Sequence, residues 1–278
     1  MTLHDDLSYV IDVARGAGKM VRANYGKVER LTKTHASANH EAVTEADRAS
    51  QRYIVQRLRD RFPTDGIIGE ESDSGDSITF DCPNPTGRAW VIDPIDGTNN
   101  FVAGFDYFAV CIALVDQGYP VLGVVYEVCR DRVYSAAQGL GAYMDRQPIH
   151  VRITPPDSSS LLVVTANLLD KAGRLPGYAV KWYGQTEWKL RCLGSAALDA
   201  AQVASGAAHA AITTNGKLWD VAAPAAIVLE AGGQVLDPSS GRAVFPFDLR
   251  NYAGAKVPFI AGTALSLPPL LADIRNNP

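Results

Sequence analysis

Residues 90–101, WVIDPIDGTNNF, run from an apolar stretch directly into two acidic residues, Asp93 and Asp96. The start of the stretch is typical of a buried strand, so Asp93 is expected at the strand's C-terminal end, where loops commonly carry function. Pro94 fixes its own φ and restricts the residue before it, so the chain cannot simply continue as a helix. Both carboxylates can then face one space. The alternative is an ordinary turn, because Asp, Pro and Gly are common turn formers.

A pair of carboxylates in this setting suits a cation. Carboxylates held close together raise each other's pKa unless a cation or a proton intervenes. Oxygen ligands without histidine or thiolate favour Mg²⁺, Mn²⁺ or Ca²⁺ over zinc, and the main-chain carbonyl of Ile95 can complete the set. Gly97 and Thr98 offer backbone N–H groups at the expected start of a short helix, which is a natural seat for phosphate. A metal ion next to a phosphate indicates phosphoryl chemistry.

Further acidic residues stand where apolar elements are expected to begin or end. Glu70, in GEES, follows the apolar pair Ile67-Ile68 and Gly69 at an expected strand end. Asp47, in VTEAD, stands three residues after Thr44, and a capping box for the second helix explains that spacing equally well. Asp220, in LWDVAAP, is expected immediately before a helix whose first turn holds Pro224, so N-capping is an alternative. Each alternative explains one acid, but none explains why several acids stand at such boundaries.

Composition and motifs exclude several classes of protein. The chain has 278 residues, of which 47% are hydrophobic, and its formal charge of −4 and pI near 5.7 offer no basic surface for nucleic acid or an anionic membrane. The N-terminus lacks the positive charge of a signal peptide, no apolar run is long enough to span a bilayer, and the four cysteines do not form a disulfide-scaffold pattern. We therefore expect a soluble cytoplasmic protein. P-loop, G-x-G-x-x-G and G-x-S-x-G motifs are absent, and the five histidines show no zinc-site or triad spacing.

Hydrophobic periodicity predicts helices over residues 5–24 and 44–62, separated by a polar, irregular segment. Short strands with close turns follow, including a hairpin around Gln117 and Gly118, and they indicate an antiparallel sheet. Residues 72–87 are expected to be a solvated loop.

Strands and helices alternate after residues 153–160, which favours a sheet covered by helices. This Pro- and Ser-rich stretch is the expected boundary between an N-terminal α+β domain with the antiparallel sheet, residues 1–152, and a C-terminal α/β domain, residues 153–278, that completes the active site.

Seven stretches together resemble the inositol monophosphatase family, the lithium-sensitive, Mg²⁺-dependent phosphatases. They occur in the family's order over most of the chain and are VTEAD, GEES, WVIDPIDGTNNF, GVVY, GLGAY, GSAAL and LWDVAAPAAIVLEAGG. The combination of DPIDGT with a distant WD is highly specific. The resemblance implies a fold of α+β to α/β class: a layered α-β-α-β-α sandwich of the inositol monophosphatase and fructose-1,6-bisphosphatase type, commonly assembled as a homodimer.

The resemblance also implies roles for individual residues, with two or three Mg²⁺ ions bound and Asp93 bridging two of them. The implied metal ligands are Glu70, Asp93, the carbonyl of Ile95, Asp96 and Asp220. The implied catalytic residues, which orient or deprotonate the attacking water or hold a further metal ion or water, are Asp47, Thr98 and Glu70. The implied phosphate- and substrate-binding residues are Gly97, Thr98, Ser195, Ala196, Thr213 and Asp220.

The implied function is hydrolysis of a small sugar, polyol or related phosphate monoester by metal-activated water. Thr213 stands where inositol-specific members carry an acidic residue, which argues against inositol and leaves histidinol phosphate, fructose-1,6-bisphosphate or a 3'-phosphonucleotide as alternative substrates. A non-catalytic protein that binds metal and phosphate is the alternative from another class. Arg191 either meets a second anionic group or is an ordinary surface arginine. The polar segment with Lys33, His35 and His40 has no assigned role.

Overall fold

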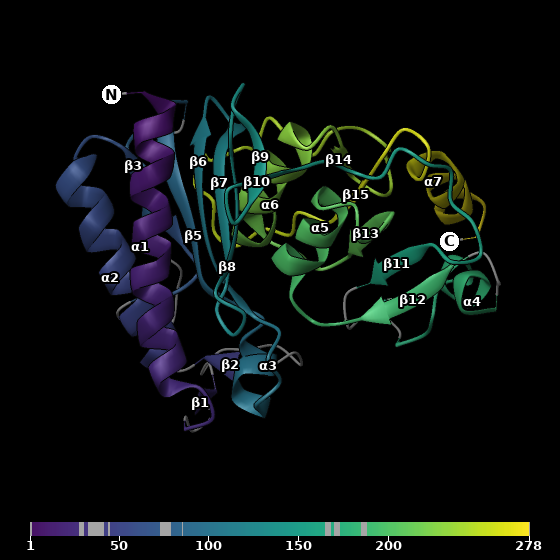
Figure 1. Cartoon of the computed structure of the whole chain (residues 1–278), viewed down its shortest axis with the longest axis horizontal. Helices are drawn as coiled ribbons and strands as arrows, with labels where there is room; N and C mark the ends of the chain where they lie inside the picture. The colour runs from purple at the N-terminus through teal and green to yellow at the C-terminus, as the bar shows by residue number, and fades with distance from the viewer. Residues whose placement is uncertain are drawn as a thin grey trace.

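The structure, a computed structural model, describes residues 2–27, 31–32, 42–43, 45–72, 79–84, 86–164, 168–169, 173–184 and 188–277. Its elements stack as successive helix, sheet, helix, sheet and helix layers (Figure 1). Three hydrophobic clusters fill the spaces between these layers. The layered sandwich expected from the sequence is confirmed.

The first layer consists of two long helices, α1 (Leu3–Asn24) and α2 (Glu45–Arg61), close to their predicted bounds. The hydroxyl of Thr2 caps α1 by accepting a hydrogen bond from the backbone N–H of Asp5 at 3.2 Å. One stripe of α1 packs on the first sheet, as its periodicity requires. The buried residues of this stripe include Leu7, Val10, Ala14, Ala17 and Val21.

The second layer is an eight-stranded sheet in the order β10-β9-β8-β7-β6-β5-β3-β4. Its strands are β3 (Gly66–Gly69), β4 (Thr79–Asp81), β5 (Arg88–Asp96), β6 (Ala109–Asp116), β7 (Tyr119–Glu127), β8 (Arg132–Ala137), β9 (Gly141–Met144) and β10 (Gln147–Ile149). Neighbouring strands are antiparallel, as predicted, except that β3 and β5 run parallel. The predicted hairpin is confirmed, because Gln117 and Gly118 join β6 to β7 with φ of 50° and 81°. The segment 72–87 is not wholly irregular, since β4 pairs with the edge of β3.

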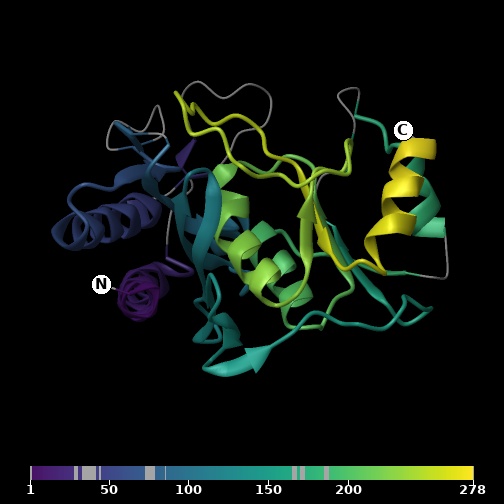
Figure 2. The same ribbon diagram turned by 90° about the horizontal axis from the view of Figure 1, so that it is seen from above.

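The third layer contains α5 (Ala196–Ala204) and α6 (Leu218–Glu230), which lie between the two sheets (Figure 2). Successive residues of β5 point to opposite faces of the first sheet. Trp90 and Ile92 belong to the core beneath α1 and α2, whereas Val91 belongs to the core around α5 and α6. Both faces of this sheet are therefore buried.

The fourth layer is a five-stranded sheet in the order β12-β11-β13-β15-β14. Its strands are β11 (Leu161–Val164), β12 (Lys189–Cys192), β13 (Ala210–Thr213), β14 (Gln234–Leu236) and β15 (Phe259–Gly262). Two outer helices, α4 (Gly177–Gly184) and α7 (Leu267–Asn276), cover its other face. The sequence patterns predict β11 to β14, but they do not indicate β15 or either outer helix.

A small two-stranded sheet pairs β1 (Leu31–Thr32) with β2 (Ala42–Val43). Thr44 and residues 33–41 lie outside the described part of the chain. The possible capping box at Thr44 and most of the predicted polar segment, with Lys33, His35 and His40, therefore lie outside the described residues.

Residues 153–160 connect β10 to β11, and therefore the first sheet to the second. The core around α5 and α6 takes residues from both sides of this connection, for example Val91 and Val163. A division into two domains here stays a prediction. The four cysteines are free. Among the described helices, none is both long and apolar enough to cross a membrane.

Candidate active site

Three acidic residues from two distant parts of the chain, β5 and α6, meet near the N-terminal ends of α5 and α6. One carboxylate oxygen each of Asp93, Asp96 and Asp220 lies within 4.8 Å of the others. Asp93 is 1% exposed and Asp96 is 5% exposed. The predicted convergence of these acids is therefore present in the fold.

A bulge in β5 explains why Asp93 and Asp96 face the same side. The strand continues to Asp96 rather than ending at Asp93, which corrects the predicted strand end. Its pairing with β6 shifts between the two acids, so Pro94 and Ile95 introduce one extra residue. On a regular strand, residues three apart point to opposite faces, and the extra residue reverses this. Pro94 has no N–H to leave unpaired, and an Asp93 carboxylate oxygen accepts the Ile95 N–H at 3.0 Å.

Asp96 is held by the N-terminus of α5. Its carboxylate accepts hydrogen bonds from the backbone N–H groups of Ala196 at 3.2 Å and Ala197 at 2.9 Å, and from the hydroxyl of Ser195. Burial raises the pKa of Asp96 to about 6, although these hydrogen bonds act in the opposite direction. Ser195 and Ala196, which were predicted on the substrate side, thus contact a predicted metal ligand in this structure.

Asp220 lies inside the first turn of α6, not before the helix. The helix begins at Leu218, and Pro224 lies beyond its first turn, so the expected position of Asp220 immediately before the helix is wrong, and the alternative that Asp220 is the N-cap is excluded. Instead, the Asp220 carboxylate accepts the backbone N–H of Lys217 at 2.7 Å, which satisfies a free donor at the helix start. Burial, followed by the negative charge of Asp96, raises the pKa of Asp220 to about 7.

Glu70 joins the cluster from the end of β3. Its backbone N–H donates to the carbonyl of Ile92 at 3.2 Å, which holds it beside the strand that carries Asp93. Burial raises the pKa of Asp93 well above its ordinary value, and the negative charges of Glu70, Asp96 and Asp220 raise it further. Buried carboxylates this close cannot all be ionised without a compensating cation. An all-oxygen donor set fits a hard divalent cation.

The predicted water-orienting residues also come together. Helix α3 (Thr98–Ala103) begins directly after the bulged strand. The Thr98 hydroxyl lies 3.2 Å from a carboxylate oxygen of Asp47 and 2.9 Å from the carbonyl oxygen of Ile95. Asp47 is fully buried within α2. The Thr98 hydroxyl, at the edge of the acid cluster, is thus within hydrogen-bond distance of the buried Asp47 carboxylate.

Gly97 is required by both conformation and space. Its φ of 92° favours glycine, and a Cβ there would lie 3.2 Å from the carbonyl oxygens of Gly194 and Tyr107. The side-chain amide of Asn100 donates to the carbonyls of Tyr107 at 2.8 Å and Leu193 at 2.7 Å. These hydrogen bonds attach α3 to the segment that leads into α5. They therefore help to fix the position of Thr98 relative to Asp96, which the N-terminus of α5 binds.

Two residues considered for substrate binding are not joined to this cluster. Thr213 ends β13 and is buried, and within the described part of the chain its hydroxyl has no hydrogen-bond partner. Arg191 is exposed, and its guanidinium donates to the carbonyl of Leu190 at 2.8 Å. The substrate roles of both stay predictions.

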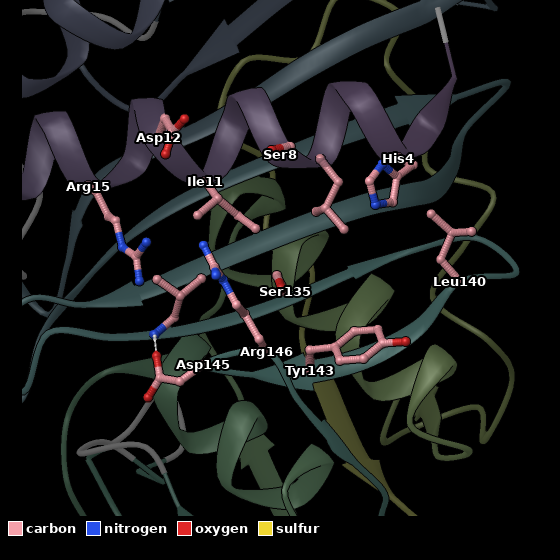
Figure 3. Close-up of a pocket in the computed structure, with 12 residues that line it drawn as sticks. His4, Ser8, Ile11, Asp12, Arg15, Ser135, Leu140, Tyr143, Asp145 and Arg146 are labelled. Carbon is pink, nitrogen blue, oxygen red and sulfur yellow. Dashed lines mark hydrogen bonds between the residues drawn. The ribbon is translucent and has the colours of Figure 1, made fainter.

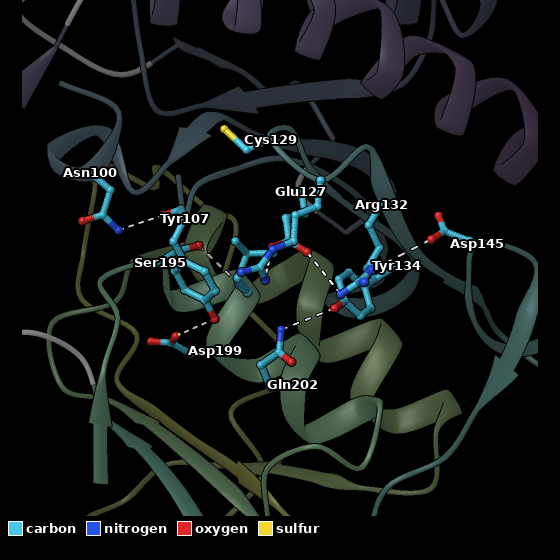
Figure 4. Close-up of polar contacts among 12 residues, drawn as sticks. Asn100, Tyr107, Glu127, Cys129, Arg132, Tyr134, Asp145, Ser195, Asp199 and Gln202 are labelled. Atoms are coloured by element: carbon cyan, nitrogen blue, oxygen red, sulfur yellow. Dashed lines mark hydrogen bonds and ion pairs between the residues drawn. The ribbon is translucent and has the colours of Figure 1, made fainter. Parts of the chain in front are cut away.

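The sequence interpretation missed several supporting residues. Cys111 pairs with Asp93 across β5 and β6, and burial together with the neighbouring acids raises the pKa of its thiol. The register of the β5–β6 pair would have identified it. The Tyr107 hydroxyl donates to a carboxylate oxygen of the buried Asp199 at 3.1 Å (Figure 4), and Tyr252 accepts a backbone N–H from the first turn of α6. No sequence motif indicates these last contacts, because they join segments far apart in the chain.

The sequence model described as "Inositol monophosphatase family" matches residues 3–267. The chain belongs to the inositol monophosphatase family. It is 33% identical over 256 residues to inositol monophosphatase 1 of Sus scrofa, which covers 88% of this chain and 86% of that protein. It is 36% identical over 253 residues to a histidinol-phosphatase of Mycobacterium tuberculosis, with 87% and 93% covered. An IMPase structure from Thermotoga maritima superposes with a TM-score of 0.82 at 31% identity and covers 97% of this chain and 96% of that one.

Membership of the inositol monophosphatase family makes the chain a phosphoric monoester hydrolase, and it agrees with the acidic metal-binding cluster. It also confirms the predicted fold type. Relatives of similar identity carry names for different substrates, so membership does not determine which ester this chain hydrolyses.

Proposed function

We propose that this protein is a Mg²⁺-dependent phosphomonoesterase that hydrolyses a small sugar, polyol or related phosphate monoester with water as the nucleophile. The observation that carries the proposal is the cluster of the buried Asp93 and Asp96 with the partly buried Asp220, in which one carboxylate oxygen of each residue lies within 4.8 Å of the others. Such a cluster needs a cation. A hydroxyl and a second buried carboxylate lie directly beside it.

The residues that would hold two or three Mg²⁺ ions are Glu70, Asp93, the carbonyl of Ile95, Asp96 and Asp220. Bound there, the ions supply positive charge that favours hydroxide over water and stabilises the oxygens of an in-line displacement. The helix N-terminus that holds Asp96 keeps its carboxylate oriented toward the other acids. Lys217 does the same for Asp220 through its backbone N–H.

Asp47 and Thr98 would orient the attacking water and take its proton. The Thr98 hydroxyl can accept a hydrogen bond from water while it donates to Asp47, so its 3.2 Å contact with that carboxylate provides a direct route for the proton. The backbone N–H groups of Gly97 and Thr98 would bind the phosphate of the substrate.

Inositol phosphate and histidinol phosphate are the two main candidate substrates, because each is supported by a different relative. Inositol phosphate is supported by the likeness to a relative named inositol monophosphatase 1. Histidinol phosphate is supported by the slightly higher identity to a protein named histidinol-phosphatase. The absence of an acidic residue at Thr213 favours a substrate with fewer hydroxyls to recognise. Fructose-1,6-bisphosphate and 3'-phosphonucleotides are further alternatives.

The test is a panel of these four esters, with kcat/KM measured in Mg²⁺ and again after chelation. We expect phosphate release that depends on Mg²⁺ and is slower by about 10² or more in the Asp93→Asn variant. The matched control is Asp248→Asn, which removes an exposed carboxylate paired with Arg250 and should leave activity unchanged. Tight binding of the esters with no turnover would instead favour the non-catalytic alternative.

We further propose a homodimer that works in the cytoplasm. The family resemblance supports the first part of this proposal, and the four free cysteines agree with the second. Analytical ultracentrifugation of the purified protein tests the dimer directly.

A further inference from the structure

A cavity lies between α1 and the strands β8 and β9, near the β10 end of the first sheet (Figure 3). Its volume of about 510 Å³ falls within the range of roughly 300 to 1,000 Å³ typical of small-molecule sites. None of the acids of the active site lines it, because α1 covers one face of the sheet and the acids lie toward α5 and α6 on the other. We call this cavity the α1 groove.

Two arginines extend into the α1 groove from opposite walls. Arg15 comes from α1, and Arg146 comes from the turn between β9 and β10, where its φ is 68° (Figure 3). Among the described residues, neither guanidinium forms a hydrogen bond or an ion pair. A guanidinium presents several donors in a fixed fork that matches carboxylate, sulfonate or phosphate oxygens. Two such groups facing one space favour an anion between them.

The carboxylates of the groove do not take this place. One oxygen of Asp145 accepts the backbone N–H of Val133 at 2.8 Å, and the other lies 4.0 Å from Arg132 outside the groove. Asp12 is exposed on α1 and pairs with neither guanidinium among the described residues. The two arginines therefore keep their donors for a ligand.

The other end of the groove combines apolar and ring side chains with one imidazole. Leu140, the ring of Tyr143 and the imidazole of His4 lie there, and Ile11 lines the α1 wall opposite Arg146 (Figure 3). The hydroxyls of Ser8 and Ser135 add polar contacts along the wall. A ligand that satisfies both ends has an anionic group at one end and a ring at the other.

We propose that the α1 groove binds a small aromatic anion, with its acidic group on Arg15 and Arg146 and its ring on Tyr143 and Leu140. Each arginine donates to a different side of the anion, since Arg15 comes from α1 and Arg146 comes from the β9–β10 turn, so both contribute to binding. The site is separate from the acid cluster, so its occupation does not depend on the metal ions or the phosphate ester.

The test uses two fluorescent probes of nearly the same shape, 1-anilinonaphthalene-8-sulfonate and its uncharged counterpart N-phenyl-1-naphthylamine. Each is titrated into the full chain with Mg²⁺ and saturating inorganic phosphate present, so that the active site is occupied. The expected result is one sulfonate bound per chain, with an affinity about tenfold or more above that of the neutral probe, since hydrogen bonds to charged groups are the strong ones.

Three variants localise the binding. In the double variant Arg15→Gln/Arg146→Gln, sulfonate affinity should fall about tenfold or more, while affinity for the neutral probe stays unchanged. Tyr143→Ala should weaken both probes. Arg250→Gln removes a remote, exposed arginine and should weaken neither. All three should keep wild-type phosphatase activity, which also reports correct folding. Equal sulfonate affinity in wild type and the double variant would overturn the proposal, and so would equal binding of the two probes to wild type.

Discussion

The buried acids should make the metal-free protein less stable as the pH rises, and Mg²⁺ should reverse this. Burial raises the pKa of Asp96 from 3.8 to about 6, so the folded protein binds this proton more tightly than the unfolded chain does. Stability from this group is therefore fully present below pH 3.8 and is lost as the pH rises through about 6. The pKa of Asp96 in the folded protein lies about one unit above pH 5, and one unit corresponds to about 1.4 kcal/mol. Ionisation of Asp96 alone should therefore lower the free energy of unfolding by about 1.4 kcal/mol between pH 5 and pH 8.

Two further acids of the cluster change in the same direction. The pKa of Asp93 is raised well above its ordinary value, and that of Asp220 is raised to about 7. His209 acts in the opposite direction, because burial lowers its pKa. The informative quantity is therefore the difference in Tm with and without Mg²⁺ at each pH, since His209 contributes equally to both.

Thermal unfolding followed by circular dichroism at pH 5 and pH 8, in chelator or in Mg²⁺, measures this difference. Sodium chloride at matched ionic strength is the control for screening. The stabilisation by Mg²⁺ should be larger at pH 8 than at pH 5 by about 3 °C or more, at about 2 to 4 °C per kcal/mol for a protein near this size. If Mg²⁺ raised Tm equally at both pH values, or not at all, the argument from buried, mutually repelling carboxylates would be refuted.

Three substitutions extend the test. Asp93→Asn should lower kcat/KM by about 10² to 10⁴ with the preferred ester, because this carboxylate is the predicted bridge between ions; a loss below about tenfold would contradict that role. Thr98→Val should lower kcat by about 10² to 10⁴ with little change in KM, whereas Thr98→Ser keeps the hydroxyl and should retain most activity; equal loss in both variants would argue against the hydroxyl. Gly123→Ala should cost about 3 kcal/mol or more in urea unfolding, because its Cβ would lie 2.2 Å from the Ala223 carbonyl oxygen of α6. Gly184→Ala, where a Cβ meets nothing within 4 Å, is its control, and similar stability of the two variants would contradict the close sheet–helix contact.

The elements with strong local patterns were predictable from the sequence. Helix α1 has an uninterrupted apolar stripe, and the hairpin between β6 and β7 has Gln117-Gly118 between two β-rich runs. Helices α4 and α7 lack such signals. α4 is only eight residues long and has no described cap, and α7 has prolines in its first turn. Local periodicity is too short or too interrupted to identify either helix.

The site was predictable as a set of acids but not as a geometry. The start of α6 was misplaced because Lys217 is its N-cap residue, and lysine has no side-chain acceptor that capping rules could recognise. The bulge at Pro94 and Ile95 also has no local signature beyond the proline itself. Without it, Asp93 and Asp96 would point to opposite faces of the sheet. The approach of Asp220 to these acids depends on how α6 packs on the first sheet, which no local pattern encodes.

Diffraction from crystals soaked in Mn²⁺, with an anomalous difference map, tests the metal site most directly. The account predicts at least one strong peak about 2.0 to 2.6 Å from carboxylate oxygens of Asp93, Asp96 and Asp220, and no such peak in Asp93→Asn crystals. A fully occupied Mn²⁺ elsewhere, with these three carboxylates bound only to water, would contradict it.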